Sequence, residues 1–136
     1  MAAKNYKFNT KTIHGGQQPD KAYGAVMPPI YQTSTYAQTT PGGHKGYEYS
    51  RSANPTRTAL ENALASIEDG EFGLAFGSGL AAIDAVIKLL EPGDEVISTN
   101  DLYGGSYRIF KKIFEKFGIV FHFVGMQGTD AIRDKM

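Results

Sequence analysis

The sequence predicts an α/β fold in which an extended N-terminal arm precedes a parallel βαβαβ unit. Three short apolar segments, at residues 72–76, 96–97 and 119–124, are typical of buried strands, and helical patterns separate them. Strands that alternate with helices form parallel sheets with right-handed crossovers. Residues 1–52 differ from this pattern, because glycine, proline and glutamine interrupt every periodicity there.

The N-terminal segment is interpreted as an arm that packs on another surface, because no helical or strand period in it lasts long enough to predict an element. It is nevertheless more apolar and aromatic than a disordered segment. The side chains that need a packing partner are Val26, Ile30, Tyr31, Tyr36, Tyr47 and Tyr49. We therefore expect an inter-subunit arm over residues 1–52 and the start of a larger domain over residues 53–136.

The first helix that the sequence predicts starts at Asn54-Pro55. Asparagine is a favoured N-cap residue, and proline is favoured at the first helical position. Apolar residues then recur at helical spacing on one face, and Asp69-Gly70 ends the helix. Further along, Ser106 is expected to cap a helix with an aromatic face that Gly118 ends, and Thr129-Asp130 begins another helix.

The turn Gly77-Ser78-Gly79 joins the first expected strand to a helix that is apolar nearly all round, so both are expected to be buried. Backbone N–H groups and the helix dipole attract anions at such a helix N-terminus. The turn is therefore either a phosphate cradle or a plain βα turn with Ser78 as the N-cap. The loop at residues 100–105 would lie at the same edge of a parallel sheet, which favours the cradle.

Composition excludes several classes of protein. The 14 basic and 14 acidic residues cancel, so no net field attracts nucleic acid or an anionic membrane. The absence of cysteine excludes disulfides and thiolate metal sites, and the three histidines lack metal-ligand spacing, so we expect no metal. Neither a signal peptide nor an apolar run of membrane-spanning length is found, which predicts a cytoplasmic protein.

Four side chains outside the glycine turn could carry chemistry. Tyr49 and Arg51 are two residues apart and share one side of an extended chain, which makes a clamp for phosphate or carboxylate unless Arg51 pairs with a surface acid. Tyr103 precedes two glycines and can stack on a flat cofactor or pack against the next helix. Arg108 is either a ligand or an ordinary surface charge on that helix.

Three segments, in this order and at this spacing, resemble the Cys/Met-metabolism family of pyridoxal-phosphate enzymes, and most closely its cystathionine γ-lyase and γ-synthase branch. They are residues 47–57 (YEYSRSANPTR), 76–82 (FGSGLAA) and 101–108 (DLYGGSYR). Residues 12–16 (TIHGG) and 28–35 (PPIYQTST) are similar as well. The resemblance implies the start of a fold-type-I, aspartate aminotransferase-like domain with pyridoxal 5'-phosphate as its cofactor.

The resemblance also implies roles for individual residues. Backbone N–H groups of Gly79 and Leu80 would bind the cofactor phosphate, and Tyr49 and Arg51 would reach that phosphate in the neighbouring subunit of a tetramer. Tyr103 would stack on the pyridine ring and relay protons, so it is the catalytic residue expected within this chain. The implied substrate contacts are Arg108, Arg51 and Tyr103.

The implied activity is the formation or cleavage of cystathionine, with cystathionine, cysteine and activated homoserine as substrates. O-acetylhomoserine sulfhydrylase and methionine γ-lyase are alternatives within the family. Its Schiff-base lysine lies further along than Met136, so the 136-residue chain is expected to be inactive alone. Two readings from other classes are a small phosphate- or nucleotide-binding module and a non-catalytic truncated product.

Overall fold

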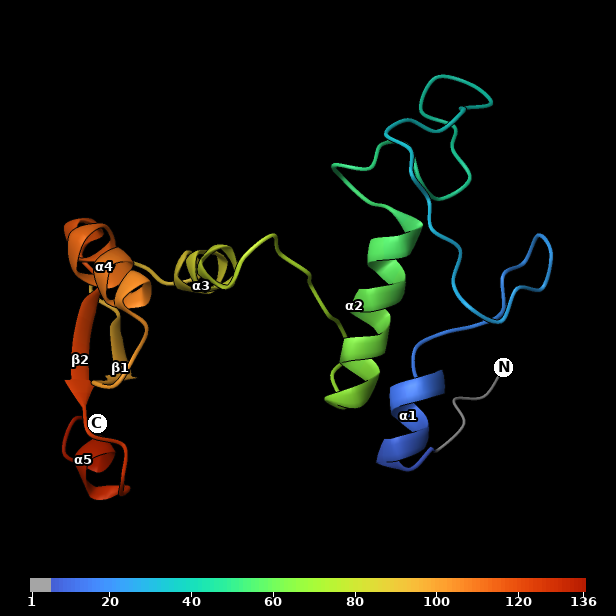
Figure 1. Ribbon diagram of the computed structural model, residues 1–136. Coiled ribbons are helices and arrows are strands. Elements are labelled where there is room, and N and C mark those ends of the chain that lie inside the picture. Colours follow the sequence, from blue (N-terminus) through green and yellow to red (C-terminus); the bar gives the residue numbers. More distant parts are fainter. Residues whose placement is uncertain (1–5) are drawn as a thin grey trace. The chain divides into compact units, whose positions relative to one another are not determined.

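The computed structural model describes residues 6–136, which divide into two compact units (Figure 1). One unit ends at Ala75 and the other begins at Phe76. The expected boundary between an arm and a larger domain, after residue 52, stays a prediction. Among the described residues, no helix combines the length and the apolarity that crossing a membrane requires.

The N-terminal unit contains two helices that contact each other, α1 (Phe8–His14) and α2 (Pro55–Ile67). Their close approach depends on Gly16, where a Cβ atom would lie 2.1 Å from the carbonyl oxygen of Asn62 and the φ angle is +67°. The prediction that residues 1–52 hold no regular element is wrong at α1. That helix has 7 residues and no side-chain cap, so it is too short to produce a readable periodicity.

Helix α2 begins where the sequence predicts. The Asn54 side chain accepts a hydrogen bond from the Thr56 N–H at 2.8 Å, and Pro55 occupies the first turn. Between the two helices the chain forms turns and two isolated antiparallel bridges, Thr35 with Tyr49 and Thr40 with Gly43. These bridges bring the segment before α2 alongside earlier residues of the N-terminal unit.

The C-terminal unit is built on two parallel strands, β1 (Glu95–Thr99) and β2 (Val120–Val124), paired in register from Glu95–Val120 to Thr99–Val124. Helix α4 (Gly104–Lys112) and the 3₁₀ helix η1 (Phe114–Phe117) form the connection between them. Helix α3 (Gly79–Ile87) precedes β1, and α5 (Asp130–Arg133) follows β2.

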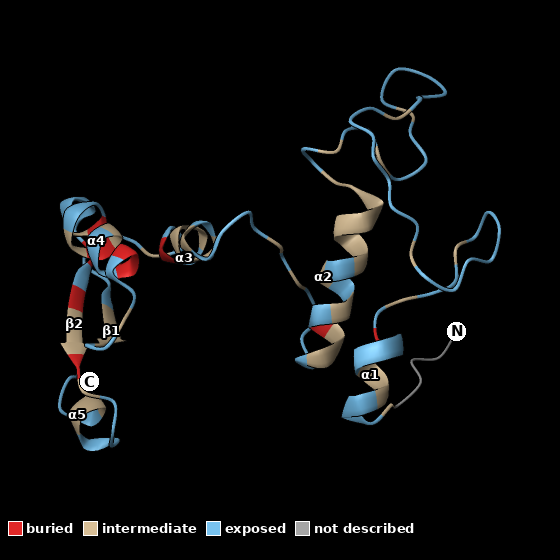
Figure 2. Cartoon of the chain, viewed as in Figure 1, coloured by how far each residue is buried: buried red, intermediate tan, exposed pale blue. Residues whose placement is uncertain are grey.

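The core of the C-terminal unit lies between α4 and the sheet, where buried segments of α4 and β2 are coloured red in Figure 2. The rings of Phe110 and Phe121 stack there with centroids 4.6 Å apart. The buried members of this cluster are Ile87, Phe110, Phe114, Ile119 and Phe121. Gly118 takes a left-handed conformation, with φ of +83°, and ends η1 as predicted.

The predicted strand at residues 72–76 is wrong. The segment has no strand partner among the described residues, and its side chains are open to solvent, with Phe72 82% and Leu74 76% exposed. Helix α3 is also less buried than predicted, because Ile87 is its one buried residue and Val86 is 61% exposed. Apolar composition predicts the need for burial, but burial requires a neighbouring element.

The predicted cap at Ser106 is wrong as well. Helix α4 begins at Gly104, and the carbonyl of Tyr103 accepts the N–H groups of Ser106 at 2.9 Å and Tyr107 at 3.2 Å. Ser106 therefore lies inside the first turn, where it is buried. The helix starts earlier than a serine cap would place it, because two glycines follow Tyr103 and adopt helical geometry without a capping side chain.

Candidate cofactor site

The Gly77–Gly79 turn ends in a capped helix N-terminus. Ser78 is the N-cap of α3, and its Oγ accepts a hydrogen bond from the Ala81 N–H at 3.2 Å. Its carbonyl accepts the Ala82 N–H, also at 3.2 Å. The expected capping role of Ser78 is thus confirmed. The Ala82 bond is the first bond of the helix itself, and the Ser78 side chain satisfies one of the four N–H groups that a helix N-terminus leaves unpaired, that of Ala81.

The other three N–H groups belong to Ser78, Gly79 and Leu80, and within residues 6–136 they donate to no acceptor. The two glycines of the turn are uncrowded, since a Cβ atom at Gly77 or Gly79 would meet nothing within 4 Å. A phosphate ester needs convergent donors, positive potential and room for its oxygens. The residues present fit such a group, and the capped turn and the phosphate cradle are compatible descriptions of the same structure.

Tyr103 precedes α4 on the loop that follows β1. The loop is tied to the sheet, because the Asn100 N–H donates to the Val124 carbonyl at 2.9 Å and the Asp101 N–H to Thr99 Oγ1 at 3.2 Å. The Tyr103 side chain is 73% exposed. Its ring crosses the backbone of Gly105, where a Cβ atom would lie 2.3 Å from Cε1 of the ring. An exposed ring beside a bare backbone can stack on a flat ligand.

Arg108 lies on α4, and its side chain is exposed. Within the part of the chain that the structure describes, it forms no ion pair. Its role as a substrate contact stays a prediction.

Tyr49 and Arg51 are brought together, although not in the way their spacing suggested. The segment is a turn rather than an extended strand, because the Tyr49 carbonyl accepts the N–H groups of Ser52 and Ala53, each at 3.0 Å. The Arg51 guanidinium nevertheless lies 4.9 Å from the centroid of the Tyr49 ring. No acidic side chain among the described residues pairs with Arg51, so the alternative of a surface ion pair is not realised.

Four lysines of the C-terminal unit lie on its helices or, for Lys88, at the C-cap of α3. Lys88 pairs with Asp84 at 2.6 Å, and Lys111 pairs with Glu115. Lys112 and Lys116 are exposed on α4 and η1. That none of these lysines binds the cofactor covalently stays a prediction.

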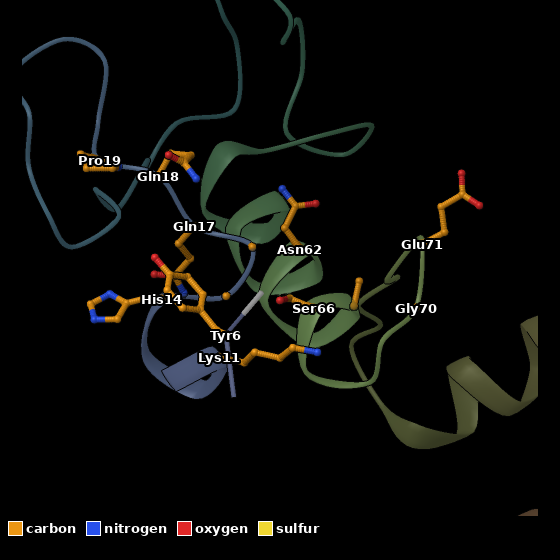
Figure 3. Close-up of a pocket in the computed structure, with 13 residues that line it drawn as sticks. Tyr6, Lys11, His14, Gln17, Gln18, Pro19, Asn62, Ser66, Gly70 and Glu71 are labelled. Carbon is orange, nitrogen blue, oxygen red and sulfur yellow. The ribbon is translucent and has the colours of Figure 1, made fainter. Parts of the chain in front are cut away.

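A cavity of about 530 Å³ in the N-terminal unit contains none of the predicted site residues (Figure 3). Residues from α1 and the loop after it form one wall, and residues from α2 and the turn after it form the other. No local pattern predicts this cavity, because its two walls are about 50 positions apart in the chain. Its lysine, Lys11, pairs with Asp69. Size alone therefore does not favour it over the glycine turn, where unpaired donors are exposed to a ligand.

Within the C-terminal unit, the acceptor-free amides of the glycine turn and the exposed Tyr103 ring at a strand-to-helix loop are features that α/β proteins use to bind phosphate esters. The family described as "Cys/Met metabolism PLP-dependent enzyme" matches residues 9–136. The chain belongs to this family, which confirms the resemblance seen in its motifs.

Individual relatives carry several names within that family. The chain is 49% identical over 138 residues to cystathionine β-lyase of Coxiella burnetii, an alignment that covers 98% of this chain and 36% of the relative. It is 49% identical to a probable cystathionine γ-synthase of Herpetosiphon aurantiacus, covering 95% of this chain and 40% of the relative. The crystal structure of cystathionine γ-lyase from Lactobacillus plantarum complexed with L-serine matches with a TM-score of 0.85 and 43% identity, covering 96% of this chain and 34% of that one.

The predicted fold class, the start of a fold-type-I domain, is therefore confirmed, and the chain spans between a third and two-fifths of the length of these relatives. Several relatives are named cystathionine β-lyase, an activity that the sequence motifs did not predict.

Proposed function

We propose that this chain forms the phosphate-binding part of a pyridoxal-phosphate enzyme that makes or cleaves cystathionine. The observation that carries the proposal is the pair of acceptor-free N–H groups at Gly79 and Leu80, on a turn where a Cβ atom at Gly79 would meet nothing within 4 Å. Family membership supports the choice of cofactor, and the names of the relatives support a sulfur amino acid as substrate.

Pyridoxal phosphate, when bound, acts as an electron sink for bonds to the substrate carbon. The N–H groups of Gly79 and Leu80 would donate to its phosphate oxygens, aided by the dipole of α3. Tyr103 would stack on the cofactor ring, and its hydroxyl would hold or move a proton at the substrate. Arg51 would add a charge-assisted hydrogen bond to the phosphate, and Tyr49 would orient the guanidinium through the ring contact at 4.9 Å.

The proposed substrates are cystathionine, cysteine and activated homoserine, and Arg108 is the proposed further substrate contact. The β-lyase among the relatives adds β-cleavage to γ-cleavage and γ-synthesis as candidate reactions. O-acetylhomoserine sulfhydrylase and methionine γ-lyase remain alternatives within the family. We further propose a cytoplasmic homo-oligomer in which residues 1–52 reach a neighbouring subunit, while the covalent lysine lies in the length of the relatives that this chain does not match.

The test uses the full-length protein that carries this segment. Apoprotein prepared by dialysis is titrated with pyridoxal phosphate while its absorbance is recorded, and the holoenzyme is then supplied with cystathionine. Release of cysteine would identify γ-cleavage, release of homocysteine would identify β-cleavage, and cystathionine formation from cysteine would identify the synthase. A protein that fails to bind pyridoxal phosphate, or that binds a nucleotide saturably instead, would overturn the proposal.

A further inference from the structure

We propose that Asn54 is a positioning residue that holds Tyr49 and Arg51 in place to receive the cofactor phosphate. The inference rests on the proposed function of those two side chains. It comes from one side chain in the N-terminal unit, because Asn54 links the start of α2 to three separate points of the preceding segment.

The contacts of Asn54 use both ends of its amide. The Nδ2 group donates to the Tyr31 carbonyl at 3.1 Å, to Ser50 Oγ at 2.9 Å and to the Tyr36 hydroxyl at 3.3 Å. The Oδ1 atom accepts the Thr56 N–H at 2.8 Å. An amide carries two N–H donors, so three acceptors around Nδ2 share them.

Ser50, one of those acceptors, lies between Tyr49 and Arg51 in the chain. Its N–H donates to the Ser34 carbonyl at 2.8 Å, and its Oγ donates to the Thr33 carbonyl. Tyr49 itself forms the antiparallel bridge with Thr35. Hydrogen bonds therefore fix both the backbone and the side chain of Ser50. Because Tyr49 and Arg51 are bonded to Ser50 on either side, their backbone positions are restricted as well.

The other end of the turn is held from α2. The Arg57 side chain donates to the Ser52 carbonyl at 2.6 Å, and its Nε lies 3.5 Å from Glu61 Oε1. Arg51 lies between Ser50 and Ser52 in the chain, the two residues that these hydrogen bonds fix. Its side chain is exposed, and within the described residues its contact is with the Tyr49 ring. The network thus fixes the turn and leaves the guanidinium available to a ligand.

A turn that is already ordered loses less conformational entropy when a ligand binds. It therefore binds phosphate more tightly than a flexible turn does. A helix cap alone would not require asparagine, since serine and aspartate cap as well. What serine lacks is the reach and the two N–H donors of the amide. Asn54→Ser therefore keeps the cap on α2 and removes the contacts with Tyr31, Tyr36 and Ser50.

The experiment compares variants of the full-length protein by their Kd for pyridoxal phosphate, the thermal unfolding of the apoprotein, and hydrogen exchange over residues 48–52. Asn54→Ser is expected to raise Kd about tenfold while the unfolding temperature stays close to that of the wild type. Faster exchange at residues 48–52 is expected in the same variant. Ser50→Ala, which leaves the cap intact, should repeat these effects if Asn54→Ser does not fold.

Thr39→Val is the matched control, because Thr39 Oγ1 donates to the Gly43 carbonyl at 3.3 Å elsewhere in the same segment and touches none of the network. It should leave Kd unchanged. A double-mutant cycle with Arg51→Ala isolates the positioning role: Asn54→Ser should have little further effect on Kd once Arg51 is gone. An additive effect in that background would show that Asn54 acts on general stability and would overturn the inference.

The inference and the proposed function fail in different ways. Wild-type Kd in both Asn54→Ser and Ser50→Ala, combined with a large loss in Arg51→Ala, overturns the positioning role and supports the function. Unchanged Kd in Arg51→Ala overturns the phosphate contact itself, and with it the inference that depends on it.

Discussion

The substitution Gly105→Ala tests whether the Tyr103 ring belongs to the cofactor site. Its new methyl group would lie 2.3 Å from Cε1 and 3.0 Å from Cδ1 and Cζ of that ring. Ordinary carbon–carbon contact needs about 3.5 Å, so the ring must move by about 1.2 Å, and its 73% exposure lets it do so.

This substitution should preserve the stability of the apoprotein but weaken its affinity for the cofactor. Alanine is favoured over glycine in a helix by up to about 1 kcal/mol, so the apoprotein should unfold at or slightly above the wild-type temperature. A displaced ring loses a stacking contact of about 0.5–1.5 kcal/mol. That loss corresponds to a Kd for pyridoxal phosphate about two to twelve times higher.

Titration of the full-length apoprotein with pyridoxal phosphate measures this effect. Gly104→Ala is the control, because a Cβ atom at Gly104 would meet nothing within 4 Å although the position lies in the same helical turn. The control should bind like the wild type. Equal affinities of the two variants, or a displaced Tyr103 ring with no loss of affinity, would refute the stacking role.

Three further substitutions or measurements follow from the structure. Gly79→Ala should leave the apoprotein's unfolding temperature at or slightly above that of the wild type, since nothing lies within 4 Å of the new atom, and should raise Kd for pyridoxal phosphate; equal binding would rule out close approach of the phosphate to that position. Phe110→Ala removes a buried ring stacked at 4.6 Å and should lower the free energy of unfolding in urea by about 3–5 kcal/mol, whereas a loss under about 1 kcal/mol would contradict the packing. The isolated 136-residue chain exposes Phe72 and Leu74, so it should aggregate or bind a hydrophobic dye; a monodisperse monomer with a cooperative thermal transition would contradict this.

The sequence predicted those elements whose starts and ends depend on residues within a few positions in the chain. The start of α2 was predictable because Asn54 and Pro55 are favoured at the first positions of a helix. The end of η1 was predictable because glycine readily adopts the left-handed conformation, with φ of +83°, that Gly118 has there. The strands at β1 and β2 were readable as short apolar runs. The cap at Ser78 was readable for the same reason, since its side chain acts on the first turn of its own helix.

Pairing and burial were not readable in this way. The run at residues 72–76 has the composition of a buried strand, yet a strand exists where another backbone satisfies its N–H and C=O groups. The Ala75 N–H instead donates to the Glu61 carboxylate at 3.0 Å. Helix α1 was not predicted, because its 7 residues span too few turns to show a helical periodicity of apolar residues.

The sequence by itself determined the family, the cofactor that the family uses and the residues that carry its motifs, because these depend on residue identity and spacing along the chain. The tertiary structure decided how those residues meet. Arg51 reaches the Tyr49 ring through a turn rather than an extended strand, and Asn54 holds that turn through contacts 4 to 23 positions away in the chain. Contacts between distant positions depend on how the backbone closes on itself, and no local pattern specifies them.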